Sequence, residues 1–175
     1  MKKIAIGVCL ACALSGCGTP QKLAPVKDEP VRAGVVSTVD KKRLAQGTTD
    51  ITVRAFKPAA SADKKALPQE VVGVPCTVAS DEVRAKVITP QIVTVPNFKQ
   101  RAAFPNRGLP SALIVTCETG TLRGVASATS KAKQVTTATG GGLAIALITA
   151  ATTAAVANST PWVYPPAVSV TMDNK

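Results

Sequence analysis

The chain has 175 residues, no histidine and a formal charge of +11 at pH 7. Without histidine it lacks Ser-His-Asp triads, Cys-His pairs and histidine-ligated zinc sites. Aromatic residues make up only 3% of the chain, too few for a platform on which nucleic-acid bases could stack. We therefore predict a non-enzymatic protein without a catalytic residue, metal, cofactor or nucleic-acid partner.

Residues 1–16 have the layout of a secretion signal. Lys2 and Lys3 precede an apolar run, Ile4 to Leu14, that is too short to span a bilayer as a helix. The run ends in Leu14-Ser15-Gly16-Cys17, which resembles the lipobox of bacterial lipoproteins. The diacylglycerol of a lipoprotein is attached as a thioether, so the residue after the cut must be cysteine. We predict a lipoprotein signal peptide over residues 1–16 and lipid on Cys17.

Lipid on Cys17 would hold the protein on a membrane without a spanning segment. Each buried acyl CH₂ contributes about 0.8 kcal/mol, so two or three chains such as palmitate give a stable anchor. Gly18 and Thr19 follow Cys17. An aspartate just after the lipidated cysteine, which would resemble the inner-membrane retention signal of enteric bacteria, is absent. We expect the protein in the cell envelope, on the periplasmic face of the outer membrane.

Residues 17–48 are predicted to form a lipidated, flexible and disordered tether. Pro20, Pro25 and Pro30 stand among polar residues, and no apolar periodicity is sustained. A coil of about thirty residues spans on the order of 30 Å, which would lift the folded part clear of the lipid headgroups.

Residues 49–135 show the pattern of a small antiparallel β-sandwich. Apolar and polar residues alternate with period two in Ile51–Phe56 and Val83–Val87, as in half-buried strands. Further short runs rich in β-branched residues are Val71–Val78, Ile92–Val95 and Leu113–Cys117. Turn markers such as Ser80-Asp81 and Thr89-Pro90 separate the runs, so the fold is predicted to be mainly β.

The two cysteines of this region are Cys76 and Cys117. Cys9 and Cys12 would leave with the leader and Cys17 would be modified, so these two remain to pair. In an oxidising periplasm such a pair on predicted strands forms a structural disulfide, worth about 2–4 kcal/mol. A redox-active or metal-binding pair is the alternative, although the C-x-x-C spacing and other soft ligands nearby are lacking.

Asp81-Glu82 is the candidate for a paired acid/base site in the first two-thirds of the chain. Adjacent residues point to opposite faces of a strand, and in a turn they are usually solvated charges. We therefore predict no catalytic role for this pair.

Three motifs of this region resemble the PEGA-like repeat of bacterial envelope lipoproteins. They are Val74-Pro75-Cys76-Thr77, the stretch Thr89–Pro96 with the sequence TPQIVTVP, and Ile114–Gly120 with the sequence IVTCETG. The resemblance covers about residues 70–172. It implies that Thr89-Pro90 fixes a turn, that Ile92–Val95 completes a hairpin, and that the cysteine pair staples the sheet. It also implies a surface or binding module without catalytic residues.

A Gly/Ala-rich apolar segment follows, as in related small lipoproteins. Gly140–Gly142 precede fifteen uncharged residues, Leu143 to Ala157, that favour a helix. Such a helix covers about 22 Å, against roughly 30 Å of hydrocarbon in a bilayer. We predict an apolar helix over 138–158 that packs on the sheet or lies in the membrane surface. The alternative is a spanning helix, or self-association of copies through residues 140–157.

Residues 159–175 are predicted to be a C-terminal strand and tail. In the related lipoproteins an aromatic-Tyr-Pro motif and a short strand close the unit, which here corresponds to Trp162–Met172. Trp162 and Tyr164 are the chain's single Trp and Tyr. They fit either the edge of a core or an interfacial belt.

The positive charge bears on partners. Loss of the leader removes Lys2 and Lys3 but no acidic residue, which lowers the charge only from +11 to +9. Acidic partners in the envelope are peptidoglycan, anionic lipids and lipopolysaccharide. The densest basic runs, Lys41-Lys42-Arg43 and Lys64-Lys65, are either solvated surface or a binding patch.

These observations leave three functions open. The preferred one is a structural or accessory lipoprotein of the envelope, because catalytic side chains are lacking. The second is a basic module that binds peptidoglycan or lipopolysaccharide. The third is an accessory protein that inserts its 138–158 segment into the membrane.

Overall fold

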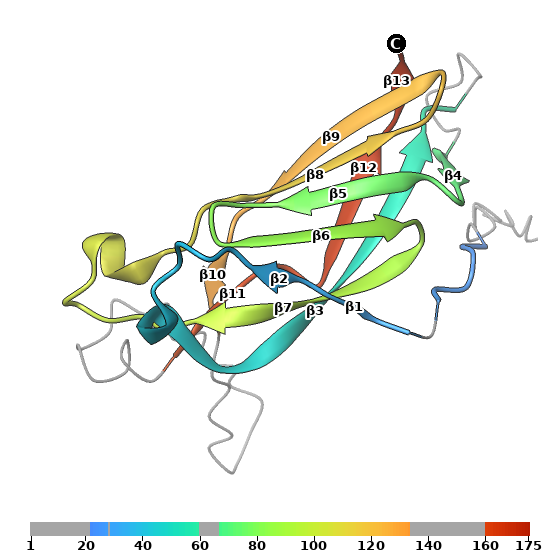
Figure 1. The fold of residues 1–175 in the computed structure, drawn as a ribbon. Helices are drawn as coiled ribbons and strands as arrows, with labels where there is room; N and C mark the ends of the chain where they lie inside the picture. Colours follow the sequence, from blue (N-terminus) through green and yellow to red (C-terminus); the bar gives the residue numbers. More distant parts are fainter. Residues whose placement is uncertain (1–21, 28, 60–66, 134–159) are drawn as a thin grey trace, which may run out of the picture.

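The computed structural model describes residues 22–27, 29–59, 67–133 and 160–175, which form two β-sheets packed around one core (Figure 1). No α-helix occurs among these residues, and the prediction of a mainly β fold is confirmed. The predicted signal peptide 1–16, Cys17 and the apolar helix 138–158 lie outside the described residues.

One sheet is built around the long strand β3 (Leu44–Lys57). The antiparallel strand β7 (Gln91–Phe98) lies on one side of β3, and the parallel strand β12 (Ala167–Thr171) lies on the other. The sheet continues from β7 to β11 (Trp162–Val163) and β10 (Lys131–Ala132), while β1 (Val31–Arg32) pairs with β7 and β4 (Gln69–Val71) pairs with β3.

The second sheet is antiparallel throughout its described pairs. Its strand order is β13 (Asp173–Asn174), β9 (Leu122–Ala128), β8 (Leu113–Glu118), β5 (Pro75–Ala79), β6 (Val83–Ile88) and β2 (Gly34–Val35). Two short 3-10 helices, η1 (Lys41–Arg43) and η2 (Pro105–Gly108), lie at the same end of the sandwich, at the left in Figure 1.

The core forms because the strands alternate as the sequence predicts. Along β6, Val83, Ala85 and Val87 are buried, whereas the residues between them are exposed. Val53 of β3 and Val115 of β8 meet them in the same buried cluster. The period-two pattern therefore identifies both inner faces correctly.

The strand pairing differs from the prediction in two places. β12 runs parallel to β3, and β1 runs parallel to β7, so the sandwich is not wholly antiparallel. Both strands come from the chain ends and join a sheet edge without a hairpin. Alternation with period two is the same in parallel and antiparallel strands, so it cannot indicate their direction.

The predicted tether 17–48 is too long. β1 and β2 pair with β7 and β6, and β3 already begins at Leu44. These pairings are held by backbone bonds to strands more than forty residues away, which leave no periodic pattern in the local sequence. The sandwich therefore includes residues 31–48 and is not confined to 49–135.

The hairpin that the family resemblance implied at Thr89-Pro90 is also absent from the described sheets. The turn connects β6 of one sheet with β7 of the other, so the two strands do not pair. Each strand buries one face in the core, and this burial is the same whether the turn joins two sheets or closes a hairpin. The alternating pattern therefore does not distinguish the two arrangements.

Of the predicted C-terminal strand and tail, residues 160–175 are described, and their strands belong to both sheets of the sandwich. β12 completes the first sheet and β13 the second, because the chain passes from one sheet to the other at the buried Met172. Gly124 of β9 lies against this crossing. A Cβ at that position would come within 2.1 Å of the Thr171 carbonyl oxygen, so the close approach of the strands requires glycine.

Candidate functional site

The predicted lipidation site and lipobox, Leu14 to Cys17, lie outside the described residues, which begin at Lys22. The chain from Ala24 is fixed to the sandwich. The Ala24 N–H donates to Glu70 Oε2 at 2.7 Å, and Arg54 Nη1 donates to the Ala24 carbonyl at 3.0 Å. Arg54 and Glu70 form an ion pair whose side chains are 16% and 7% exposed.

The same segment remains attached as it runs toward β2. The Gln91 amide donates to the Glu29 carbonyl, and the Ala33 N–H donates to the Thr94 carbonyl at 2.9 Å. The Val36 N–H donates to the Glu82 carbonyl at 2.8 Å. The chain therefore crosses from the first sheet to the second along one side of the molecule.

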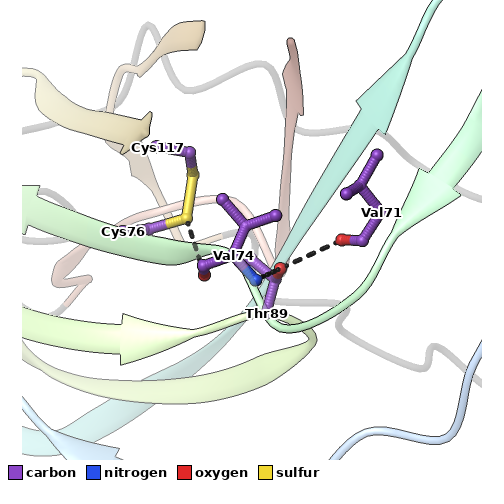
Figure 2. Close-up of a disulfide and its surroundings, with 5 residues drawn as sticks. All are labelled: Val71, Val74, Cys76, Thr89 and Cys117. Carbon is purple, nitrogen blue, oxygen red and sulfur yellow. Dashed lines mark hydrogen bonds between the residues drawn. A yellow bond between two sulfur atoms is a disulfide. The ribbon is translucent and has the colours of Figure 1, made fainter. Parts of the chain in front are cut away.

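The predicted disulfide between Cys76 and Cys117 is present. The two residues lie directly opposite each other on β5 and β8, with their Cα atoms 4.1 Å apart, so the bridge joins neighbouring strands of one sheet. Figure 2 shows it beside the buried Thr89, whose hydroxyl accepts from the Val74 N–H and donates to the Val71 carbonyl. Both cysteines are buried, and this end of the sandwich is held by covalent and polar contacts together.

Asp81 and Glu82 do not form an acid/base pair. Glu82 is only 3% exposed, accepts from Arg43 Nη2 at 3.3 Å and from the Ser80 hydroxyl at 3.1 Å, and receives the Ser111 N–H. Asp81 is exposed and accepts from the Ser111 hydroxyl. Glu82 is thus a buried structural carboxylate and not the solvated charge that the sequence predicted.

Tyr164 extends this polar cluster into the C-terminal segment. Its ring lies at the core edge, 2% exposed, and packs edge-on against Phe98 with ring centroids 6.5 Å apart. Its hydroxyl donates to the Ser111 carbonyl at 2.7 Å. Burial raises the pKa of the hydroxyl from 10.0 to about 12.

This raised pKa predicts a loss of stability in alkali. The buried, protonated Tyr164 hydroxyl stabilises the folded state. This contribution is fully present below pH 10, the ordinary pKa of tyrosine, and is lost as the pH rises through about 12. Urea unfolding of the wild type and of Tyr164→Phe, compared between neutral pH and pH 11, measures it. At neutral pH the variant is expected to be about 0.5–1.5 kcal/mol less stable, and this gap should shrink in alkali. Parallel pH profiles would contradict the assignment.

Basic side chains gather at the end of the sandwich that carries η1 and η2, which we call the distal end. Lys99, Arg101, Arg107, Lys131 and Lys133 lie on segments whose backbones meet there, and they define the distal basic patch. The Arg101 N–H donates to the Arg107 carbonyl at 3.2 Å, and the Arg107 carbonyl also receives the indole N–H of Trp162 at 3.1 Å. The Lys133 N–H donates to the Pro161 carbonyl at 2.9 Å.

The basic runs of the sequence have different places in the structure. Lys41 and Lys42 are exposed on η1 at the distal end, whereas Arg43 pairs with Glu82. Lys64-Lys65 lies outside the described residues. The sequence did not reveal the distal basic patch because its members are scattered along the chain and meet only through the β10–β11–β7 pairing.

Neither a metal site nor a spanning helix is found in the described part of the chain. No three His, Cys, Asp or Glu side chains gather there in a way that would hold a metal ion. The helices of that part are too short to cross a bilayer.

No family model, curated protein or solved structure matches this chain. The resemblance to PEGA-like lipoproteins stays a prediction.

Proposed function

We propose that the chain is a lipoprotein of the cell envelope, anchored through lipid on Cys17 to the periplasmic face of the outer membrane, with a structural or accessory role. The observation that carries the proposal is the lipobox Leu14-Ser15-Gly16-Cys17 at the end of an apolar run of signal-peptide length.

The folded part is consistent with this compartment and role. The Cys76–Cys117 disulfide suits an oxidising environment such as the periplasm. Glu82 belongs to Asp81-Glu82, the candidate pair for acid/base chemistry. Its carboxylate accepts hydrogen bonds from Arg43 and from the Ser111 N–H, and these bonds stabilise the fold. These features support a rigid module that acts through its surfaces.

Metabolic labelling with a palmitate analogue tests the anchor. Wild-type protein should incorporate the label and sediment with outer membranes, whereas Cys17→Ala should incorporate none and keep its leader, because the thioether cannot form. Cys12→Ala is the matched control, since it removes a cysteine of the leader outside the lipobox. Equal labelling of Cys17→Ala and wild type would exclude the proposal.

The distal basic patch favours one alternative function, the binding of an anionic envelope polymer such as peptidoglycan or lipopolysaccharide. Arg101, Arg107, Lys131 and Lys133 are exposed, and Lys99 and Arg101 line a cavity of about 250 Å³ together with Thr160 and Pro161. Exposed charges attract such a polymer over about 8 Å at physiological salt.

Co-sedimentation with purified sacculi and with lipopolysaccharide tests this alternative. Retention should be strong at low salt and lost at high salt, and Lys99→Glu/Arg101→Glu should abolish it. Arg123→Glu on β9 is the control for a change of charge elsewhere. If wild-type protein is not retained at low salt, the binding function is excluded.

The third candidate function, insertion into the membrane, depends on residues 138–158, which lie outside the described part of the chain.

A further inference from the structure

The end of the sandwich opposite the distal end carries several exposed apolar side chains. Leu23, Leu67, Val72 and Ile88 are 45%, 59%, 58% and 47% exposed, and they make up half of the large exposed apolar residues among those described. They lie near the last residues of β3 and β6 and the first residues of β5, at the right in Figure 1. We call this the proximal end.

Specific contacts bring these residues to one place. Leu23 precedes Ala24, which is bound by Arg54 and Glu70, and Glu70 pairs with Phe56 near the end of β3. Leu67 and Val72 flank the same short strand β4. Ile88 pairs with Pro75, and the next residue, Thr89, bonds to Gly73 and Val74. The four residues therefore adjoin backbone that strand pairing and hydrogen bonds hold at this end of the sandwich.

The proximal end also receives the chain from Cys17. Residues 18–21 separate Cys17 from Lys22, the first described residue. Because an extended chain covers at most about 3.6 Å per residue, the distance from Cys17 to Lys22 is at most about 18 Å. A lipid on Cys17 therefore brings this end of the sandwich within reach of the bilayer.

The charges at the proximal end suit anionic headgroups. Lys22, Lys27 and Lys57 are exposed there, and so is the carboxylate of Glu29. Two other carboxylates nearby are paired, Glu70 with Arg54 and Glu118 with Lys175. Lysines beside an anionic membrane surface strengthen attachment, and exposed apolar side chains enter its interface.

We propose that the proximal end is a membrane-contact surface on which the sandwich stands, with Leu23, Leu67, Val72 and Ile88 in the lipid interface and the lysines among the headgroups. This proposal rests on the lipidation of Cys17 proposed above. It goes further, because a lipid anchor alone would leave the sandwich free to turn.

The single tryptophan makes the orientation measurable. Trp162 lies at the distal end, bound to Arg107, and serves as the far reference. Purified lipidated protein is reconstituted into vesicles of phosphatidylethanolamine and phosphatidylglycerol with brominated acyl chains, which quench tryptophan at short range. The wild type is compared with Val72→Trp/Trp162→Phe and Leu67→Trp/Trp162→Phe. Val125→Trp/Trp162→Phe is the control, because Val125 is 57% exposed on the outer face of β9.

Tryptophan at position 72 or 67 should be quenched at least about twofold more than Trp162 or a tryptophan at position 125, since interfacial side chains lie only about 5–10 Å into the headgroup and acyl boundary. Equal quenching at all positions in protein shown by mass spectrometry to carry lipid would overturn the contact surface and leave the lipoprotein function standing. A Cys17 without lipid would overturn both proposals.

Discussion

Removal of the disulfide should cost this sandwich about 4 kcal/mol of unfolding free energy. The bridge links residues 41 positions apart, and closing a loop of that length restricts the unfolded chain by roughly this amount. Cys76→Ala/Cys117→Ala avoids a buried free thiol. Its urea midpoint should fall well below that of the wild type. The slope of unfolding against urea should rise, because the released chain exposes more surface.

A reducing agent provides the control for that experiment. Dithiothreitol added to the unfolding reaction should lower the midpoint of the wild type to that of the double variant and leave the variant unchanged. If the oxidised wild type and the variant unfold at the same urea concentration, the bridge does not stabilise the fold.

Gly124→Ala should destabilise the protein by about 3 kcal/mol or more. The added methyl group would lie 2.1 Å from the Thr171 carbonyl oxygen and 2.8 Å from Val170 Cγ1. Thr171 ends β12 just before the chain passes into the second sheet, so its backbone cannot move without disturbing the pairing of β12 with β3 and of β13 with β9. Overpacking against fixed backbone costs 1–3 kcal/mol or more.

The matched control is Gly120→Ala in the turn between β8 and β9. A Cβ there meets no atom within 4 Å, so the variant should unfold within about 0.5 kcal/mol of the wild type. Urea unfolding of both variants separates the close approach at Gly124 from the general effect of replacing glycine. Equal midpoints for Gly124→Ala and Gly120→Ala would contradict the tight crossing.

The strands with the clearest alternation could be predicted from sequence. β6 was predicted as Val83–Val87 and extends by one residue, because its buried and exposed positions alternate without a break. β9 was not predicted, because its sequence LRGVASA contains a glycine and few β-branched residues. That glycine is required by the crossing of β12, a partner more than forty residues away.

In the candidate site, too, features that depend on local sequence could be predicted, and features that depend on distant partners could not. The cysteine pairing could be predicted by elimination, since only Cys76 and Cys117 remained. The attachment of the segment around Ala24 to the sandwich could not be predicted, because Ala24 binds Glu70, which lies 46 positions away in the sequence. The burial of Glu82 also depends on a distant partner, Arg43, which the sequence presented as part of a basic run.

The length of β3 has a consequence for how far this protein reaches. Its 14 residues run from Leu44 at the distal end to Lys57 at the proximal end, and a strand rises about 3.3 Å per residue. Because β3 is irregular between Leu44 and Thr48, the two ends are at most on the order of 40 Å apart. If the protein stands on a membrane through lipid on Cys17, as proposed, the sandwich would act as a spacer. It would hold the distal basic patch well above the headgroups, together with Lys133 and Thr160, between which the chain lies outside the described part.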